Sequence, residues 1–466
     1  MLKAKIVQPS HPLKKIAIQT HRISAFCLFL AVSACGEKPS DMEQMADTLS
    51  ATLKEVASAE DELNNDTALS DFGEAIRQAV EGNEGYRAAL ALEQEMTSRI
   101  EVAASQRRPQ ISGNTTMGGL REEGGSQIDE TTTGIAAGIS ISQLVYDGGE
   151  SASNINRATA EALGARAERI VRSNEIALDA ARAWIDVWQF RARLSLLNTR
   201  TAEIETFVAQ IERMASNGMI DRAALNSAQR EIVDISLERA RLQADKSQAE
   251  IRFRRLFNQR PNAVPQPAEL FNVSQVRNQA EAWQNAPALQ RSAAELISAR
   301  SAVAGAQAAF KPRARLQAGV TSPMEGDEST DTSVGLMLEY TIGDGGRREA
   351  QLEAAEARVK ALEAQLQDAL RTLEAEMATA LHQLATIDKS MPLVKEQLRL
   401  SKSEAQTAQS QLATGQSNLR QVVEATIENY RAEDRQIEMQ AERSFLLLSI
   451  SARTGALANA LGLPSN

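Results

Sequence analysis

The chain repeats one plan twice, and this duplication restricts its fold more than any single motif does. Asp147-Gly148-Gly149 recurs 197 positions later as Asp344-Gly345-Gly346. Two proline-led extended segments, starting at Pro109 and Pro312, are 203 positions apart. Self-similarity at a nearly fixed offset indicates that each half folds as the same unit.

Each half has the same predicted order of elements: a helix, two strands joined by a polar loop, Asp-Gly-Gly, a very long helix, a glycine turn and a returning helix. We expect the halves at residues 68–260 and 285–455, a linker at 261–284 and a tail at 456–466. The expected strands are 109–119, 132–144, 312–321 and 332–342, and the expected long helices are 148–215, 220–258, 346–412 and 416–453.

The strand assignments depend on alternation with a period of two. In the second half, the residues on one side are Val334, Leu336, Leu338 and Tyr340, and those on the other are Ser333, Gly335, Met337 and Glu339. In the first half, Ile135, Ala137, Ile139 and Ile141 alternate with Gly134, Ala136, Gly138 and Ser140. One face therefore suits hydrocarbon and the other tolerates water. The segments Leu120–Glu130 and Ser322–Asp331 are polar and glycine-containing, which predicts hairpin loops.

The helix assignments depend on the spacing of prolines as well as on helical periodicity. No proline lies between Pro109 and Pro261. A helix of nearly 70 residues, about 100 Å long, is therefore permitted after Gly148. In the second half, Pro392 predicts a kink or break near Ser390-Met391.

Four strands are too few to close into a barrel within one chain. Membrane barrels begin at about eight strands, and an open sheet leaves unpaired backbone groups in lipid at several kcal/mol each. Copies of the chain must therefore complete the wall. Two copies would supply eight strands and three would supply twelve, and the strand count does not choose between them.

The first 34 residues are expected to be an export signal rather than part of the fold. A basic leader precedes the apolar run Ile23–Ala34, which is too short to span a bilayer as a helix. The run ends Val32-Ser33-Ala34-Cys35-Gly36, which resembles a bacterial lipobox, and this resemblance implies lipidation, including palmitate, at Cys35. An ordinary cleaved signal that contains a cysteine is the alternative. Residues 35–67 then form an acidic tether.

Charge and residue counts exclude several functional classes. The formal net charge is −10, and the basic leader makes the remainder more acidic still, so nucleic acid is a poor partner. Cys27 and Cys35 are the only cysteines, and neither a disulfide framework nor a thiolate metal site can form. His11 and His21 lie in the leader, which leaves His382 alone for histidine-based catalysis or metal binding. We therefore expect no enzyme, no catalytic residues, no metal and no cofactor.

The chain resembles a known family, the TolC-like outer-membrane efflux proteins, over residues 68–455. The similar segments are Ser70–Ile76, the strand starts at Pro109 and Pro312, Gln143–Gly149 and Leu412–Tyr430. The duplication of Asp-Gly-Gly in register within this order is the most specific of these features. The strand-to-helix turns are thus assigned to Asp147, Gly148, Gly149, Asp344, Gly345 and Gly346.

The resemblance implies a homotrimer in the outer membrane, with a twelve-stranded β-barrel above a tunnel of helical hairpins. It places a mixed equatorial belt at Asn258–Gln284, around Pro392 and near the C-terminus. The helix tips at Gly218 and Gly415 would contact a periplasmic adaptor that is served by an inner-membrane pump. Small-molecule efflux and type I protein secretion both remain open.

The resemblance also implies an acidic constriction a few residues after the second tip. Glu424 occupies that position, while Gln421 stands where family members often have a second acid. A ring of Glu424 side chains would attract cations. The alternative for the whole chain is a lipid-anchored periplasmic coiled-coil adaptor or structural tether without a pore, which needs the long helices but not the strands.

Overall fold

The computed structural model describes residues 71–122, 130–217, 222–323, 330–414, 416 and 418–464. The export signal, Cys35, the acidic segment 35–67 and the tip glycines Gly218 and Gly415 lie outside the described residues.

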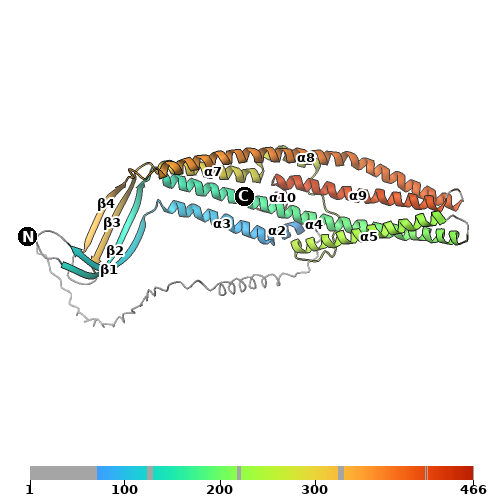
Figure 1. The fold of residues 1–466 in the computed structure, drawn as a ribbon, viewed down its shortest axis with the longest axis horizontal. Coiled ribbons are helices and arrows are strands. Elements are labelled where there is room, and N and C mark those ends of the chain that lie inside the picture. The colour runs from blue at the N-terminus through green and yellow to red at the C-terminus, as the bar shows by residue number, and fades with distance from the viewer. Residues whose placement is uncertain are drawn as a thin grey trace, which may run out of the picture. The chain divides into compact units, whose positions relative to one another are not determined.

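The order of elements confirms a mainly helical fold with four strands (Figure 1). The first half contains α2 (Phe72–Glu81), α3 (Glu84–Ser105), β1 (Gln110–Glu122), β2 (Glu130–Tyr146), α4 (Glu150–Ser216) and α5 (Arg222–Phe257). The linker forms α6 (Val273–Glu281) and the 3-10 turn η2 (Trp283–Asn285). The second half contains α7 (Pro287–Ala308), β3 (Arg313–Pro323), β4 (Asp331–Glu339), α8 (Arg347–Ala413), α9 (Leu419–Arg453) and α10 (Ala456–Ala460).

The strand bounds differ from the expected ones at the hairpin ends and at one turn. β1 ends at Glu122 and β2 begins at Glu130, so the pairing of the two strands extends into the segment expected as a loop. β4 ends at Glu339, before Tyr340, and the chain then runs irregularly to Asp344. Backbone pairing across a hairpin can carry a strand into polar sequence that alternation alone assigns to a loop.

Of the kink or break expected at Pro392, the break is wrong, because α8 runs from Arg347 to Ala413 with this proline inside it. Pro392 is exposed, so solvent can satisfy the carbonyl group that loses its intrahelical partner. On either side of it, Ile387 and Val394 are buried. Packing of the apolar stripe therefore holds the helix together across the proline.

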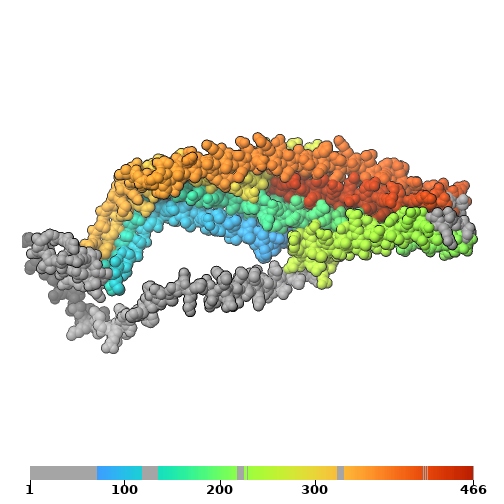
Figure 2. Space-filling model, in the orientation of Figure 1, coloured from blue at the N-terminus to red at the C-terminus, as the bar shows by residue number. Residues whose placement is uncertain are grey.

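α4 is the centre of the helical body. It packs against α3, α5, α7 and α9, whereas α8 packs against α7 and α9. Buried alanines, among them Ala177, Ala180, Ala181 and Ala183, let these neighbours approach α4 from several sides. In Figures 1 and 2, α8 runs along the upper edge of the helices that adjoin the sheet and α3 runs along their lower edge, with α4 and α7 between them.

An aromatic core lies midway along the helices. Trp184 of α4 is fully buried and contacts the rings of Phe72, Phe253 and Phe257. Its indole N–H donates to the carbonyl of Pro265, at 3.0 Å. The short helices α2, α6 and α10 contribute to the same core, so the linker and the C-terminal segment pack around the long helices at one level.

The C-terminal segment is fixed by polar contacts to α4 as well as by its leucines. The backbone amide of Ala458 donates to Asn174 Oδ1, at 2.9 Å. The buried guanidinium of Arg169 donates to the Pro464 carbonyl and to Glu93 of α3, each at 2.5 Å. Among the described residues, no helix combines the length and apolar character needed to cross a bilayer.

Candidate functional site

The four strands form one antiparallel sheet in the order β1-β2-β3-β4. Its register places the apolar alternations of all strands on one face, since Ile111 pairs with Ile141, Ile139 with Val320, and Leu316 with Leu336. The opposite face carries a polar row, Ser112, Ser140, Gly319 and Ser333, in successive strands. The two-faced pattern expected for each hairpin thus continues across the whole sheet.

The apolar face is uncovered in the single chain. Met117 is 78% exposed, Val334 76% and Leu338 69%. Tyr146 is 50% exposed and Tyr340 is 58% exposed, and both lie at the strand ends nearest the helices. Exposed apolar patches of this kind mark contact with lipid or with a partner.

The first strand-to-helix turn is closed around Asp147. Its carboxylate accepts hydrogen bonds from the amides of Gly149 (3.0 Å) and Ser151 (2.7 Å), at the start of α4. Gly148 has φ +68°, and a Cβ there would lie 2.6 Å from Cβ of Lys311. Only glycine fits this left-handed position against Lys311, whose Nζ donates to the Gly148 carbonyl at 3.1 Å.

The second turn has the same backbone but a different environment. Gly345 and Gly346 have φ +69° and +85°, yet a Cβ on either would meet no atom within 4 Å. Asp344 accepts from Nε of the buried Arg348, at 2.8 Å. The two Asp-Gly-Gly turns therefore share their shape, but only the first has its glycine packed against another part of the chain; the second turn contacts that part through Arg348, which donates to the Ala309 carbonyl at 3.3 Å.

The helix tips are described up to their flanks. α4 ends at its C-cap Asn217 and α8 at Thr414, and α9 begins at the N-cap Asn418. Asn418 Oδ1 accepts from the amide of Gln421, at 2.9 Å, while Gln421 Oε1 accepts from the amide of Asn418, at 3.2 Å. Gln421 therefore has a capping role that the sequence analysis did not assign to it.

Glu424 is exposed one turn further along α9 and is paired with Arg420. Arg420 Nε donates to the Glu424 carboxylate at 2.7 Å, and this hydrogen bond raises the pKa of Arg420. Arg420 was not among the predicted site residues, although Arg and Glu four residues apart on a helix are an ordinary pairing signal. Any charge that Glu424 presents is accompanied by an opposite charge beside it.

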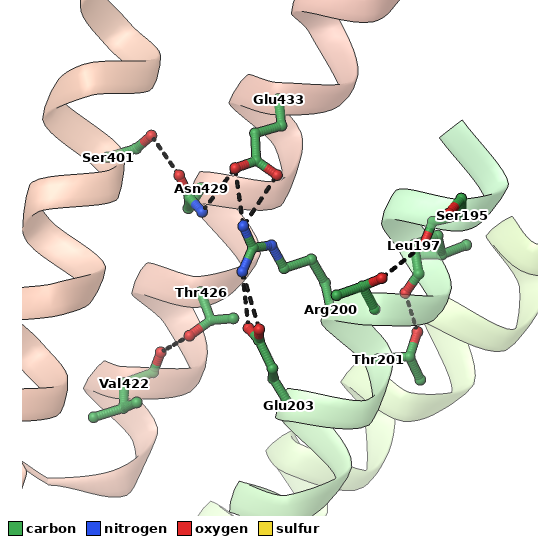
Figure 3. Close-up of polar contacts among 11 residues, drawn as sticks. Ser195, Leu197, Arg200, Thr201, Glu203, Ser401, Val422, Thr426, Asn429 and Glu433 are labelled. Carbon is green, nitrogen blue, oxygen red and sulfur yellow. Dashed lines mark hydrogen bonds and ion pairs between the residues drawn. The ribbon is translucent and has the colours of Figure 1, made fainter. Parts of the chain in front are cut away.

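A polar network joins α4, α8 and α9 above the tips, in the region drawn in Figure 3. Arg200 of α4 donates to Glu203 on its own helix and to both carboxylate oxygens of Glu433 on α9, at 2.9 and 3.1 Å. Asn429 Nδ2 donates to Glu433 at 3.5 Å, and Ser401 Oγ of α8 donates to Asn429 Oδ1 at 3.4 Å. The side chains of Figure 3 thus connect both helical hairpins of the chain.

α4 and α9 are joined again about two turns further along α4. Arg193 of α4 donates to both oxygens of Asp434, at 2.7 and 2.9 Å. Burial lowers the pKa of Arg200, but the hydrogen bonds that Arg200 donates to Glu433 and Glu203 outweigh it and raise that pKa overall. Burial, reinforced by nearby Asp434, raises the pKa of Tyr430. These ion pairs hold α9 against α4, and the raised pKa values keep Arg200 protonated and the Tyr430 hydroxyl un-ionised near neutral pH.

The remaining candidates for chemistry are not brought together. His382 lies on α8 with its side chain exposed. Among the described residues no three His, Cys, Asp or Glu side chains gather closely enough to hold a metal ion. The features that remain as candidates for function are the two faces of the sheet, the two Asp-Gly-Gly turns, the helix tips and the ion pairs between α4 and α9.

A family model decides the affiliation of the chain. The outer membrane efflux protein family matches residues 75–259 and 279–456. The chain belongs to this family. Outer membrane efflux proteins are channel proteins rather than enzymes, and the family match agrees with the resemblance found in the sequence.

Solved structures show the same fold at low sequence identity. A membrane protein from Pseudomonas aeruginosa has a TM-score of 0.70 and 18% identity, over 82% of this chain and 89% of that chain. The CmeC outer membrane channel of Campylobacter jejuni has a TM-score of 0.70 and 13% identity, over 83% and 86%. The open state of the Neisseria gonorrhoeae MtrE outer membrane channel has a TM-score of 0.68 and 18% identity, over 83% and 89%. No curated protein sequence matches the chain.

Proposed function

We propose that this protein is the outer-membrane duct of a tripartite export system, a passive channel formed by three copies of the chain. The observation that carries the proposal is the sheet, which has one exposed apolar face, one polar face and two open edges, β1 and β4. In lipid, the apolar face is removed from water, which is favourable, and the polar face lines a water-filled lumen.

The open edges argue for assembly. Roughly half of the N–H and C=O groups of an edge strand point away from its only partner. Each such group left unpaired in hydrocarbon costs several kcal/mol, so a lone sheet in lipid is strongly disfavoured. Pairing β4 of one copy with β1 of the next removes both edges. Three copies give twelve strands, and the resemblance to TolC-like proteins favours this number over two.

The helices supply the rest of the duct. α4 and α8 each have 67 residues, about 100 Å at 1.5 Å per residue, which is long enough to cross much of a periplasm. In this proposal the tips beside Gly218 and Gly415 contact a periplasmic adaptor and an inner-membrane pump. Glu424 and Gln421 lie near the narrow end, and Cys35 carries a lipid that adds an anchor in the outer membrane.

Conductance tests the channel directly. Full-length protein extracted from outer membranes should have the mass of a trimer by native mass spectrometry and should produce single-channel currents in a planar bilayer. A monomer that leaves the membrane when its lipid is removed, with no conductance, would favour the adaptor or tether. Crosslinking from residues flanking the tips, such as Asn217 and Thr414, followed by mass spectrometry of the captured proteins, identifies the adaptor and separates efflux from type I secretion.

A further inference from the structure

A cavity of about 570 Å³ lies between α4, α5 and α9. Part of its lining is apolar, with Ile185 and Phe190 from α4 and Phe445 and Leu446 from α9. A space of this size accommodates a small organic molecule, and sites for such molecules combine apolar walls with a few placed polar groups. The cavity takes no part in the sheet, the turns or the helix tips.

The cavity opens on the side of α4 that faces away from the linker. Trp184 of α4 donates to the Pro265 carbonyl at 3.0 Å and therefore points toward the linker. Ile185, Gln189 and Arg193 line the cavity. At 3.6 residues per turn they are rotated by roughly 100°, 140° and 180° from Trp184 about the helix axis.

The same holds on α9. Ser451 donates to Gln279 of α6, at 2.8 Å. Glu442 lines the cavity nine residues earlier, which places it roughly 180° from Ser451 around the helix. The resemblance to TolC-like proteins places the linker and α6 in a belt around the tunnel. In the proposed duct the cavity therefore opens toward the lumen.

Two of the three arginines that line the cavity are already neutralised. Arg182 Nε lies 2.9 Å from Asp186 Oδ1. Arg193 donates to both carboxylate oxygens of Asp434, at 2.7 and 2.9 Å. Arg252 also contacts Asp186, at 2.9 Å, but does not line the cavity. Neither Arg182 nor Arg193 therefore presents an uncompensated positive charge to the cavity.

Three carboxylates line the same space and are less well paired. They belong to Asp245 of α5 and to Glu438 and Glu442 of α9. Glu438 is 3.8 Å from Arg193, with 59% of its side chain exposed, and among the described residues Asp245 and Glu442 form no ion pair. The third arginine, Arg241, lies four residues before Asp245 on α5 and can compensate only one of the three. The cavity thus has an excess of negative charge.

The aromatic rings favour the same sign of ligand charge. The Arg182 guanidinium lies over the Phe445 ring, 4.5 Å from its centroid, so this ring already stabilises a cation. Phe190 is a second, partly exposed ring in the lining. An inorganic cation would leave both rings and Leu446 unused, whereas an organic anion would meet the three carboxylates.

We propose that this cavity binds organic cations with an apolar body and holds them in the wall of the duct on their way through the lumen. The inference rests on the proposed duct and names a class of substrate for it. The apolar body lies against Phe190 and Leu446, and the positive charge lies near Glu438 and Glu442. Three copies of the chain supply three such sites around the lumen.

Protection of an introduced thiol tests the site. Leu446 is partly buried in the cavity wall, and L446C in the assembled protein extracted from membranes should react with N-ethylmaleimide. Tetraphenylphosphonium should slow this reaction several-fold. Tetraphenylborate, which has the same shape and the opposite charge, should not. Mass spectrometry of the peptide that contains position 446 follows the reaction without interference from Cys27 and Cys35.

Charge variants identify the carboxylates. In the L446C background, E438Q/E442Q should raise the tetraphenylphosphonium concentration for half-protection by about tenfold, because two attractive charges near the bound cation are lost. E438K/E442K should reverse the preference, so that tetraphenylborate protects. D234N/E404Q removes the same amount of charge from exposed positions of α5 and α8 outside the cavity and should leave the protection unchanged.

Further controls exclude unspecific effects. L237C places the thiol at an exposed apolar position of α5 outside the cavity, and neither ion should protect it. Isothermal titration calorimetry of the protein without an introduced cysteine should show the same preference for tetraphenylphosphonium, which excludes a site created by the substitution. Native mass spectrometry and circular dichroism report assembly and folding of each variant.

The outcomes separate this inference from the proposed function. Equal protection by the two ions, or protection that E438Q/E442Q leaves unchanged, overturns the cation site. A conducting trimer in which neither ion protects L446C and calorimetry detects no binding also overturns it, and leaves the duct standing. A lone, non-conducting molecule that still binds tetraphenylphosphonium in this charge-dependent manner contradicts the duct and leaves the cation site standing.

Discussion

Replacing Glu433 by Gln tests whether the network of Figure 3 holds α9 to α4. Arg200 and Glu433 belong to different hairpins, 233 residues apart, and their side chains are 22% and 21% exposed. The substitution keeps the size and one acceptor oxygen of the side chain but removes its charge. Arg200 retains Glu203, at 3.0 Å, so the change does not strand a buried cation.

The expected cost follows from this partial burial. Hydrogen bonds to charged groups contribute about 1.5–3 kcal/mol. Solvent reaches about a fifth of each side chain, and exposed ion pairs contribute only about 0–1 kcal/mol, so we expect about 1–2 kcal/mol. In local opening this corresponds to roughly 5–30-fold faster amide exchange in the α9 segment around Asn429.

Hydrogen–deuterium exchange measured by mass spectrometry on the assembled protein gives this quantity for each peptide. E428Q is the matched control, because Glu428 lies on the same helix and its nearest cation, Arg431, is 3.8 Å away. Glu428 also accepts from Gln397 of α8 at 3.5 Å, and the remaining oxygen of a glutamine can still accept this hydrogen bond. If E433Q and E428Q exchange equally fast in α9, the network does not hold the helices together. In an R200A background, E433Q should add little, since both substitutions remove the same contact.

Three further predictions concern the turns, the tip and the core. G148A should destabilise the protein by about 1–2 kcal/mol from the left-handed backbone alone, with an added clash against Lys311; thermal melting no lower than wild type would contradict this. If the α9 tip lines the pore, E424A should lower its cation preference in reversal-potential measurements and R420A should raise it, whereas unchanged selectivity in both would move the pair away from the pore. Burial raises the pKa of Asp186 even though Arg182 and Arg252 lower it. Ionised Asp186 therefore lowers the free energy of unfolding at high pH, and this loss of stability disappears as the pH falls and the carboxyl is protonated. D186N should therefore gain stability relative to wild type as the pH rises from about 4 to about 7, and a difference in melting temperature that stays constant with pH would refute this.

Local signals in the sequence predicted the repeated elements, because alternation and proline spacing act over a few residues. The strands around Ile139 and Leu336 and the helices that follow both Asp-Gly-Gly turns are present in the structure. The break at Pro392 was wrong because a local rule was overridden by packing along a 67-residue helix. The duplication predicted the fold although each single motif was weak, because an assignment of helices and strands to one half must also fit the other half.

The sequence allows only part of the structure near the second helix tip to be predicted. Asn418 followed three residues later by Gln421 is a capping-box pattern, so the capping role of Gln421 could have been found in the sequence. The contact of Arg200 with Glu433 could not, because nothing local in the sequence relates residues 233 positions apart. Whether Glu424 narrows a pore depends on copies of the chain around it and stays a prediction.

The exposed alanines of α8 are informative because two explanations for them differ in what they require. Alanine is the best helix former, so a long exposed helix gains from alanine anywhere on its surface. Propensity, however, sets no spacing. Ala350, Ala354, Ala357, Ala361 and Ala364 recur at intervals of four and three and are all exposed. On α3, Ala88, Ala91, Glu95, Ser98 and Val102 recur at intervals of three and four and are likewise exposed. This is the spacing by which one helix seam fits another, and small residues in it let two backbones approach closely. Replacing Ala357 by Leu keeps helix propensity nearly unchanged and blocks the approach, so loss of the oligomer with intact helical circular dichroism would select contact over propensity.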